Sequence, residues 1–294
     1  SRTGRPIRET RSMSTLEKRR VALVTGASRG IGRAAAIALA QSGLDVAIAA
    51  RSVHRGEGLD DSDVGEGRVL PGSLDETATE VEAAGARALK LKADLHDHSS
   101  LGAACRNVLD AWGRIDVLVN NAVDTGPGSM LPFLDLTIAQ LERKLMANVV
   151  SQAVMIKAVL PSMLEAGSGV IIDVSSHVAT GDPTAPVGSG GWGIAYAASK
   201  AAFHRFAPIL SVELGDRGIR IYNVDPGYVE TERQKINAAA LGLEGRYPGA
   251  PPSVPASVVA WLATSPEADA LNGQVILAQR FAREKHLHPE WRKR

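Results

Sequence analysis

A glycine-rich stretch at residues 21–32, VALVTGASRGIG, constrains the fold more than any other part of this chain. Its first four residues are apolar and predict a strand buried on both faces of a parallel sheet, and the alanine-rich residues after it predict a helix. Gly26, Gly30 and Gly32 permit a tight turn and a close approach of ligand to backbone. Free N–H groups and the helix dipole would then favour an anion, so this context indicates a nucleotide phosphate rather than a plain strand-turn-helix unit.

Two arginines near the second predicted strand, 45–50, bear on which nucleotide is bound. In dinucleotide folds an acidic residue about 20 positions beyond the glycines holds the ribose 2′-hydroxyl, whereas a nearby arginine accommodates a 2′-phosphate. Here the strand is followed by Arg51, and Arg29 lies within the glycine turn. We therefore expect NADP(H) to be preferred, with NAD(H) possible. Two solvated arginines without a ligand are the alternative.

Apolar strand segments alternate with helix-like segments along most of the chain. Strands are expected at 21–24, 45–50, 87–91, 115–119, 170–174, 219–224 and 274–277, and helices at 34–40, 73–85, 99–112, 138–164, 196–214 and 253–263. This alternation predicts an α/β protein with three layers, in which helices cover both faces of a doubly wound, seven-stranded parallel sheet. No change of composition separates the two halves, so residues 20–280 are expected to form a single domain.

The ends of the chain and its charge exclude several classes of partner. Residues 1–19 are basic and polar without periodicity, and are expected to be a disordered extension, while 281–294 are expected to be a C-terminal tail. Lys and Arg total 33 against 32 Asp and Glu, so no net field attracts nucleic acid or a membrane surface. Cys105 is the single cysteine, which fits a reducing, cytoplasmic location, and no apolar run looks long enough to span a bilayer.

Residues 52–72 lack any period and are rich in Gly, Asp and Ser, which predicts a long loop that is either functional or mobile. Asp60, Asp61 and Asp63 within it resemble a calcium loop only superficially, because no glutamate follows at the required distance. We interpret these carboxylates as a solvated charge run and expect no metal.

Six short motifs occur in an order typical of one family. They are Thr25-Gly26-x-x-x-Gly30-x-Gly32, Asn120-Asn121-Ala122, Asn148, Ser175-Ser176, Tyr196-x-x-x-Lys200 and Pro226-Gly227. Over roughly residues 20–280 the chain resembles the short-chain dehydrogenases/reductases. The resemblance implies a Rossmann fold and an NAD(P)-dependent oxidoreductase that moves a hydride between the cofactor and a carbonyl or secondary alcohol. The cofactor-binding positions that it implies are Gly26, Ser28, Arg29, Gly30, Ile31, Gly32, Arg51, Asp94, Leu95, Asn121, Ala122, Tyr196, Lys200, Pro226, Gly227, Val229 and Thr231.

A tyrosine and a lysine on one predicted helix, with a serine after a strand, are suited to acid-base chemistry on a carbonyl group. Tyr196 and Lys200 are four residues apart on a predicted helix, so both project from one face, and the ammonium is expected to lower the pKa of the phenol. Tyr196 would then be the acid-base group, and the Ser176 hydroxyl would polarise the carbonyl oxygen. Ser175 is the alternative serine, although relatives use the second of the pair. By the resemblance, Asn148 kinks its helix and holds a water that relays protons to Lys200.

The segment between Ser176 and Tyr196 is expected to lie over the mouth of the pocket, because both of its ends are catalytic. Glycines surround Trp192 in it, which predicts a mobile lid with one large apolar anchor. With Ser176 and Tyr196, the residues expected to contact substrate are His177, Trp192 and Tyr228. A surface insertion whose tryptophan only packs on the domain is the alternative.

Three positions depart from the family pattern. Val123 stands where relatives usually have glycine, Pro208 lies inside a predicted helix that it must bend, and residues 278–280 replace the usual Asp-Gly-Gly.

Two functions remain open, a carbonyl reductase or alcohol dehydrogenase and a dinucleotide-binding regulatory protein on the same scaffold. Retention of all four catalytic residues favours the enzyme. The expected partners are a small carbonyl or alcohol substrate and further copies of the chain, as a tetramer or dimer joined through helices around 148–164 and 196–214.

Overall fold

The computed structural model describes residues 19–63, 65, 67–240, 245 and 249–291. The extension expected at residues 1–19 therefore lies outside the described residues except for Arg19, whose guanidinium donates to the Gly85 carbonyl at 2.6 Å.

Seven parallel strands form one sheet, as the sequence predicts. They are β1 (Val21–Thr25), β2 (Asp45–Ala50), β3 (Ala88–Lys92), β4 (Val117–Asn120), β5 (Gly169–Val174), β6 (Ile219–Asp225) and β7 (Val275–Leu277). Their order across the sheet is β3-β2-β1-β4-β5-β6-β7, so the chain reverses its direction of winding between β1 and β4. In such sheets ligands bind outside the carboxyl ends of the strands at this switch point.

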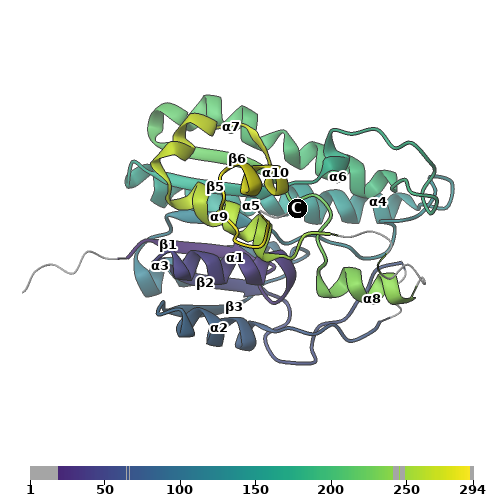
Figure 1. Cartoon of the computed structure of the whole chain (residues 1–294), viewed down its shortest axis with the longest axis horizontal. Coiled ribbons are helices and arrows are strands. Elements are labelled where there is room, and N and C mark those ends of the chain that lie inside the picture. The colour runs from purple at the N-terminus through teal and green to yellow at the C-terminus, as the bar shows by residue number, and fades with distance from the viewer. Residues whose placement is uncertain (1–18, 64, 66, 241–244, 246–248, 292–294) are drawn as a thin grey trace, which may run out of the picture.

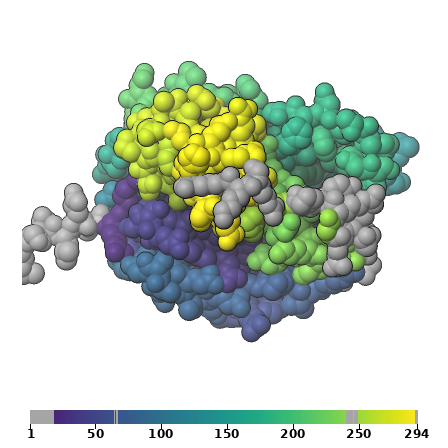
Figure 2. Space-filling view, viewed as in Figure 1, coloured from purple at the N-terminus to yellow at the C-terminus, as the bar shows by residue number. Residues whose placement is uncertain are grey.

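Helices cover both faces of the sheet and complete three layers. One face carries α1 (Gly30–Gln41), α2 (Leu74–Ala83), α9 (Ser253–Thr264) and α10 (Ala278–Glu284), and the other carries α3 (His98–Trp112), α5 (Ser151–Glu165), α6 (Ile194–His204) and α7 (Phe206–Leu214). Figure 1 places α1 and α9 together in front of the sheet. In Figure 2 the C-terminal helices, in yellow, lie next to the purple N-terminal segment on this face. Alternate strand residues supply the two cores, with Val24 on the α1 side and Leu23 on the α3 side.

The helix expected at 138–164 is continuous but not uniform. It consists of α4 (Ile138–Leu145), a π-helical segment η1 (Met146–Val150) and α5. Thr137 begins it with a capping box to Gln140. Asn148 lies inside the π-helical segment, and such insertions change the direction in which side chains project and are common at functional sites.

Length and composition alone would allow one described helix, Ile138–Glu165, to cross a membrane, which corrects the expectation that no segment reaches that length. Its buried residues Met155, Ile156, Val159 and Met163 belong to the core between the sheet and α3. The helix therefore packs as a core helix of this fold.

The helix predicted at 196–214, which Pro208 was expected to bend, is interrupted. It divides into α6 and α7 at Arg205, three residues before Pro208. Proline has no N–H to donate to the carbonyl four residues earlier, which here is that of His204. The His204 oxygen accepts from the side chain of Asn223 instead, at 2.8 Å.

Two helices were absent from the sequence interpretation. The helix α8 (Glu232–Ala240) stands beyond the carboxyl edge of the sheet, and α10 follows directly after β7. Phe281 of α10 packs edge-on against Trp261 at 5.0 Å between ring centroids, and the indole of Trp291 donates to the Gln279 carbonyl at 2.8 Å. The described part of the expected tail thus packs on α9 and α10.

The acidic run in the loop at 52–72 is not solvated, contrary to the sequence interpretation. Asp60 is fully buried and lies 3.5 Å from Arg233 of α8. Both carboxylate oxygens of Asp63 accept backbone N–H groups, from Gly128 at 2.8 Å and Met130 at 2.7 Å. The loop therefore joins α8 to the segment after β4 by ion pairs and hydrogen bonds. The described residues contain no group of His, Cys, Asp and Glu arranged to hold a metal.

Candidate active site

The glycine turn after β1 is packed so closely that side chains have no room. A Cβ on Gly32 would lie 2.3 Å from the Gly26 carbonyl oxygen, and one on Gly26 would lie 2.8 Å from the Asn121 amide nitrogen. Asn121 fixes the turn from β4, because its side-chain amide donates to the Thr25 carbonyl at 2.9 Å. Thr25 returns the contact, with its hydroxyl accepting the N–H groups of Asn121 and Ala122 at 3.0 Å each.

The first turn of α1 attracts an anion. The Gly30 N–H donates to the carboxylate of Glu232, from α8, at 2.9 Å. A carboxylate thus already stands where the sequence predicts a phosphate. Together with the glycine turn, this contact shows that the N-terminus of α1 fits an anionic group of a nucleotide.

A cavity of ≈ 310 Å³ opens above the turn at the carboxyl ends of β1, β2 and β4. Its lining includes most of the expected cofactor residues, namely Gly26, Ser28, Arg29, Gly30, Ile31, Arg51, Asp94, Leu95, Asn121, Ala122, Tyr196 and Thr231. The expected cofactor residues Gly32, Lys200, Pro226, Gly227 and Val229 do not line it.

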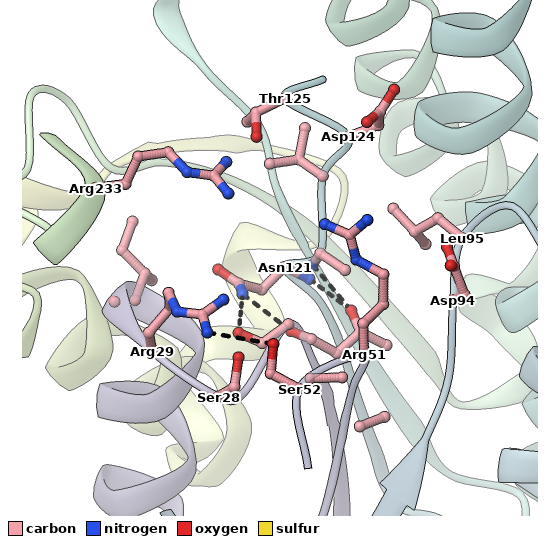
Figure 3. A pocket seen from close by; sticks show the side chains of 18 of the residues that line it. Ser28, Arg29, Arg51, Ser52, Asp94, Leu95, Asn121, Asp124, Thr125 and Arg233 are labelled. Carbon is pink, nitrogen blue, oxygen red and sulfur yellow. Dashed lines mark hydrogen bonds between the residues drawn. The ribbon is translucent and has the colours of Figure 1, made fainter. Parts of the chain in front are cut away.

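Three arginines face this cavity, and sequence reasoning found two of them. Figure 3 shows the guanidinium groups of Arg29, Arg51 and Arg233 directed toward the same space. Arg29 also braces the loop at 52–72, since it donates to the carbonyls of Pro71 at 2.9 Å and Gly72 at 3.0 Å. Burial lowers the pKa of its guanidinium, and the nearby Arg233 lowers it further. Arg233 was missed because α8 has no apolar periodicity to announce a helix.

Arg51 and Arg233 each pair with an acidic residue of the loop. Arg51 lies 3.4 Å from Asp61 and Arg233 lies 3.5 Å from Asp60. The distances are long for hydrogen bonds, so both guanidinium groups keep donors available to the cavity.

Lys200 is buried beside the end of β5. Its ammonium donates to the Val174 carbonyl at 2.8 Å. Burial lowers its pKa to about 8, while the charges of Asp173 and Asp225 act in the opposite direction. Lys200 can therefore change its protonation near neutral pH.

The pKa of Tyr196 moves opposite to the sequence prediction. Burial raises it, a hydrogen bond with Ser176 lowers it and the charge of Asp225 raises it. Desolvation of the phenolate is the largest of these effects. Ser176 and Tyr196 nevertheless lie close together, across the whole segment that separates them.

Asn148 ties the π-helical segment to two neighbours. Its side-chain oxygen accepts the Asp124 N–H at 2.7 Å, and its amide nitrogen donates to the Ser199 hydroxyl at 3.1 Å. The kink expected at Asn148 is present as a π-helical turn. Val123 lies in the loop with Asp124. Its position does not require the positive φ that glycine adopts readily, because His286 is the one non-glycine residue with positive φ among the described residues.

A buried ion pair next to Asn148 was not anticipated. The fully buried ammonium of Lys144 lies 3.1 Å from the carboxylate of Asp124 and donates to the Gly126 carbonyl at 2.6 Å. Burial raises the pKa of Asp124, but Lys144 and a backbone N–H more than offset it, so its pKa is lowered overall. This charged pair fixes the backbone of the loop beside the cavity, in which Val123 stands where relatives usually have glycine.

The two adjacent serines have different partners. Ser175 is buried and its hydroxyl lies 2.8 Å from Nδ1 of His204, whereas Ser176 is partly exposed and contacts Tyr196. Of the pair, Ser176 is thus the one that lies against the tyrosine.

Of the residues expected to contact substrate, Tyr196 lines the cavity, whereas Ser176, His177, Trp192 and Tyr228 do not. His177 and Trp192 pack edge-on with ring centroids 6.1 Å apart, and Tyr228 is 42% exposed. Gly193, next to Trp192, lies against the backbone of Ser129 and Leu131. The segment between the catalytic residues is therefore anchored at its C-terminal end to the loop after β4.

Fold and site together define an α/β protein with a glycine turn that accepts a carboxylate, and with a serine, a tyrosine and a lysine at the carboxyl edge of its sheet. The family model for "short chain dehydrogenase" matches residues 20–63 and 68–241. The chain belongs to the short-chain dehydrogenase family, an oxidoreductase family.

Three similar proteins illustrate the relationship. "Uncharacterized oxidoreductase YhdF" of Bacillus subtilis (strain 168) is 30% identical over 266 residues, covering 88% of this chain and 82% of that protein. "L-rhamnose 1-dehydrogenase (NAD(P)(+))" of Sphingomonas sp. (strain SKA58) is 35% identical over 227 residues, covering 77% and 79%. The crystal structure of a short chain dehydrogenase from Mycobacterium paratuberculosis bound to NAD is 28% identical, with a TM-score of 0.70, covering 87% of this chain and 95% of that one.

Proposed function

We propose that this chain is an NAD(P)-dependent oxidoreductase that interconverts a secondary alcohol and a carbonyl compound, with NADP(H) preferred. The observation that carries the proposal is that Tyr196, with Ser176 close to it, lines the same cavity as the anion-binding turn. A purely regulatory dinucleotide-binding protein would not need this arrangement, and the dehydrogenases among the relatives favour the enzyme.

The cofactor would be held by the backbone more than by side chains. The N-terminus of α1 would bind the pyrophosphate once the Glu232 carboxylate has moved aside, and Asn121 and Ala122 would lie near the nicotinamide end. When bound, the nicotinamide supplies or accepts the hydride. A solved relative is bound to NAD, which supports a nicotinamide dinucleotide as the ligand.

The chain's own residues would manage the proton and the substrate oxygen. The Ser176 hydroxyl would donate to the carbonyl oxygen, and the Tyr196 phenol would give up or take the proton of that oxygen. Because burial raises the pKa of the phenol, Tyr196 is protonated at neutral pH and suited to donate during carbonyl reduction. Lys200 would hold the ribose and favour the phenolate as it forms, with Asn148 fixing the adjoining helix.

A screen of ketones and secondary alcohols with each cofactor, followed by nicotinamide absorbance, tests the activity. Turnover should appear for at least one pair and should be faster at low substrate concentration with the NADP couple. Binding of either cofactor without turnover on any carbonyl or alcohol would favour the regulatory alternative.

Cofactor preference rests on the arginines around the cavity. Arg51→Ala combined with Arg233→Ala should weaken NADPH binding by about 10–100-fold, because charge-assisted hydrogen bonds contribute about 1.5–3 kcal/mol. NADH binding should change far less, and the difference should shrink at high salt. Arg29→Ala should add to the loss but also loosen the loop at 52–72, which it braces.

Titration of both cofactors by calorimetry measures these affinities. Arg280→Ala, which removes an exposed cation paired with Glu284, is the control for net charge and should leave both affinities unchanged. Equal losses for NADPH and NADH would contradict the assignment.

Three further expectations belong to this proposal. The segment with Trp192 would close over the substrate, and His177 and Tyr228 would border the entrance. The chain would act as a homo-oligomer in the cytoplasm. Exposed apolar residues on the expected contact helices, including Val150, Ile209 and Val212, support association, which light scattering would measure.

A further inference from the structure

Three polar side chains form a buried row beneath the catalytic helix α6. Asn120 of β4, Asp173 of β5 and Asn223 of β6 are in register, Asn120 opposite Asp173 and Asp173 opposite Asn223. Each is at most 1% exposed. Their position in the strand alternation places them on the sheet face that α5, α6 and α7 cover. Polar groups so placed need hydrogen-bond partners, because burying them without any is costly.

Two hydrogen bonds fix the orientation of the asparagines. The Asn120 amide donates to Oδ1 of Asp173 at 2.9 Å, and the Asn223 amide donates to the His204 carbonyl at 2.8 Å. Rotating the Asn223 amide by half a turn would set its oxygen against that carbonyl oxygen. Asn223 therefore presents its own oxygen, and not its nitrogen, to the rest of the row.

The unpaired side-chain atoms of the row are all acceptors. Oδ1 of Asn120, Oδ2 of Asp173 and Oδ1 of Asn223 are buried without a hydrogen-bond partner among the described residues. Neighbouring strands are about 4.8 Å apart, so these in-register side chains are within reach of each other. Two oxygens cannot bond unless one carries hydrogen. A proton on Asp173 would complete a chain of donors from Asn120 through Asp173 and Asn223 to His204.

Lys200 lies next to this row. Its ammonium donates to the carbonyl of Val174, the residue after Asp173, at 2.8 Å. The other titratable groups around it are Tyr196, His204 and Asp225. Burial lowers the pKa of His204, whose ring nitrogen lies against Ser175, so the imidazole is neutral at working pH. Asp124 and Lys144, across the α4 side, are paired with each other.

We infer that Asp173 is a positioning residue for Lys200: it donates a hydrogen bond to Asn223 when neutral and stabilises the Lys200 ammonium when ionised, and so sets the pH at which Lys200 loses its charge. The catalytic part of this inference rests on the proposed function, whereas the protonation of Asp173 does not.

The electrostatics agree with this geometry. Burial raises the pKa of Asp173 to about 7, against the hydrogen bond from Asn120 and the charge of Lys200. Burial lowers the pKa of Lys200 to about 8, and Asp173 is the first of the charges that raise it. Two coupled groups with neighbouring pKa values therefore titrate together over a narrow range of pH near neutrality.

Asp173→Asn is the informative variant, because an amide keeps the acceptor for Asn120 and supplies a permanent donor toward Asn223. It should fold as well as the wild type at pH 5. Removing the carboxylate lowers the pKa of Lys200, so the alkaline fall of kcat should move to lower pH by about 1 unit. As pH rises from 5 to 8.5 the melting temperature of the wild type should fall relative to that of the variant. The pKa of Asp173 is higher in the folded than in the unfolded state, so its protonation stabilises the fold at low pH and this stability is lost as pH rises through the folded-state pKa.

Infrared difference spectra between pH 5.5 and 8.5 give a readout that needs no activity. The wild type should lose a carboxylic acid C=O band with a midpoint near its pKa of about 7, and Asp173→Asn should lack that band. In Lys200→Met the midpoint should move to higher pH, because coupling between two sites is reciprocal.

The control is Asp116→Asn, at the other end of β4, where Asp116 accepts from the Val21 N–H at 2.7 Å. It should lower the melting temperature at every pH and leave the alkaline limb of kcat in place. A wild type without the infrared band, or a midpoint unmoved by Lys200→Met, would overturn the inference. So would an unmoved alkaline limb in Asp173→Asn. A protein without dehydrogenase turnover would refute the proposed function alone, since the infrared and melting experiments still decide the role of Asp173.

Discussion

The β1–α1 turn and the β5–α6 region both border the cavity, but they are built on different principles. In the first, the groups that face a ligand are mainly backbone N–H groups, and glycines are required because a Cβ on Gly32 would overlap neighbouring atoms. In the second, the working groups are the side chains of Ser176, Tyr196 and Lys200, and their properties depend on buried charges nearby.

Because of this difference, mutations in the two regions should have different effects. A backbone cradle tolerates any side chain that points away and no side chain that points in. A side-chain site keeps its shape under an isosteric change and loses its chemistry. The predictions below test whether binding and chemistry separate along this line.

The largest effect is expected from Tyr196→Phe, which removes only the transferable proton. Turnover should fall by about 10²–10⁴-fold, the usual contribution of a general acid-base, with cofactor affinity nearly intact. Steady-state kinetics and cofactor titration measure the two quantities. Tyr222→Phe, which breaks a buried hydrogen bond to the Ala268 carbonyl, should lower stability by about 1 kcal/mol and leave turnover unchanged. Tyr196→Phe with a tenth or more of wild-type turnover would refute the acid-base assignment.

The next effect concerns the cradle. In Gly32→Ala the new methyl would lie 2.3 Å from the Gly26 carbonyl oxygen and 2.4 Å from the Asn121 amide, so the turn must shift. Overpacking of this kind costs about 1–3 kcal/mol, and cofactor affinity should fall with it. Gly102→Ala, also in a helix, would meet only the flexible end of Arg106 and is the matched control. Thermal melting and cofactor titration measure both effects. If the two variants behaved alike, the requirement for glycine at position 32 would be wrong.

The smallest effect is expected from Trp192→Ala. If Trp192 closes over substrate, KM should rise or kcat fall for bulky substrates, while cofactor affinity and melting temperature barely change. Trp261→Ala, which removes the contact with Phe281, should do the reverse, lowering stability and sparing the kinetics. Loss of stability with unchanged kinetics in Trp192→Ala would make this tryptophan a structural anchor and end the lid hypothesis.

The sequence predicted the parts of this structure that depend on local patterns. Continuous apolar runs separated by helix-like segments indicated seven parallel strands, because a strand buried on both faces must be apolar throughout. Three glycines between a strand and a helix indicated the turn that the Glu232 carboxylate now contacts. Ser73 was suited to begin a helix, and the structure places it as the N-cap of α2.

Local patterns were misleading where distant segments compete for the same groups. Asp60 looked solvated until α8 brought Arg233 against it. Pro208 indicated a bend in the helix at 196–214, but not that Asn223 of β6 would donate to the carbonyl that the proline frees. The pKa of Tyr196 was expected to fall because the sequence displays Lys200 nearby and does not display burial.

By itself the sequence determined the succession of strands and helices along the chain, the glycine turn and the identity of the residues available for chemistry. Each of these depends on side chains close together in the chain. Only the tertiary structure decided which arginines face the cavity, which serine meets Tyr196 and how Lys200 and Asp173 are charged. These depend on contacts between segments far apart in the sequence and on removal from water, and neither distance nor burial is written in local spacing.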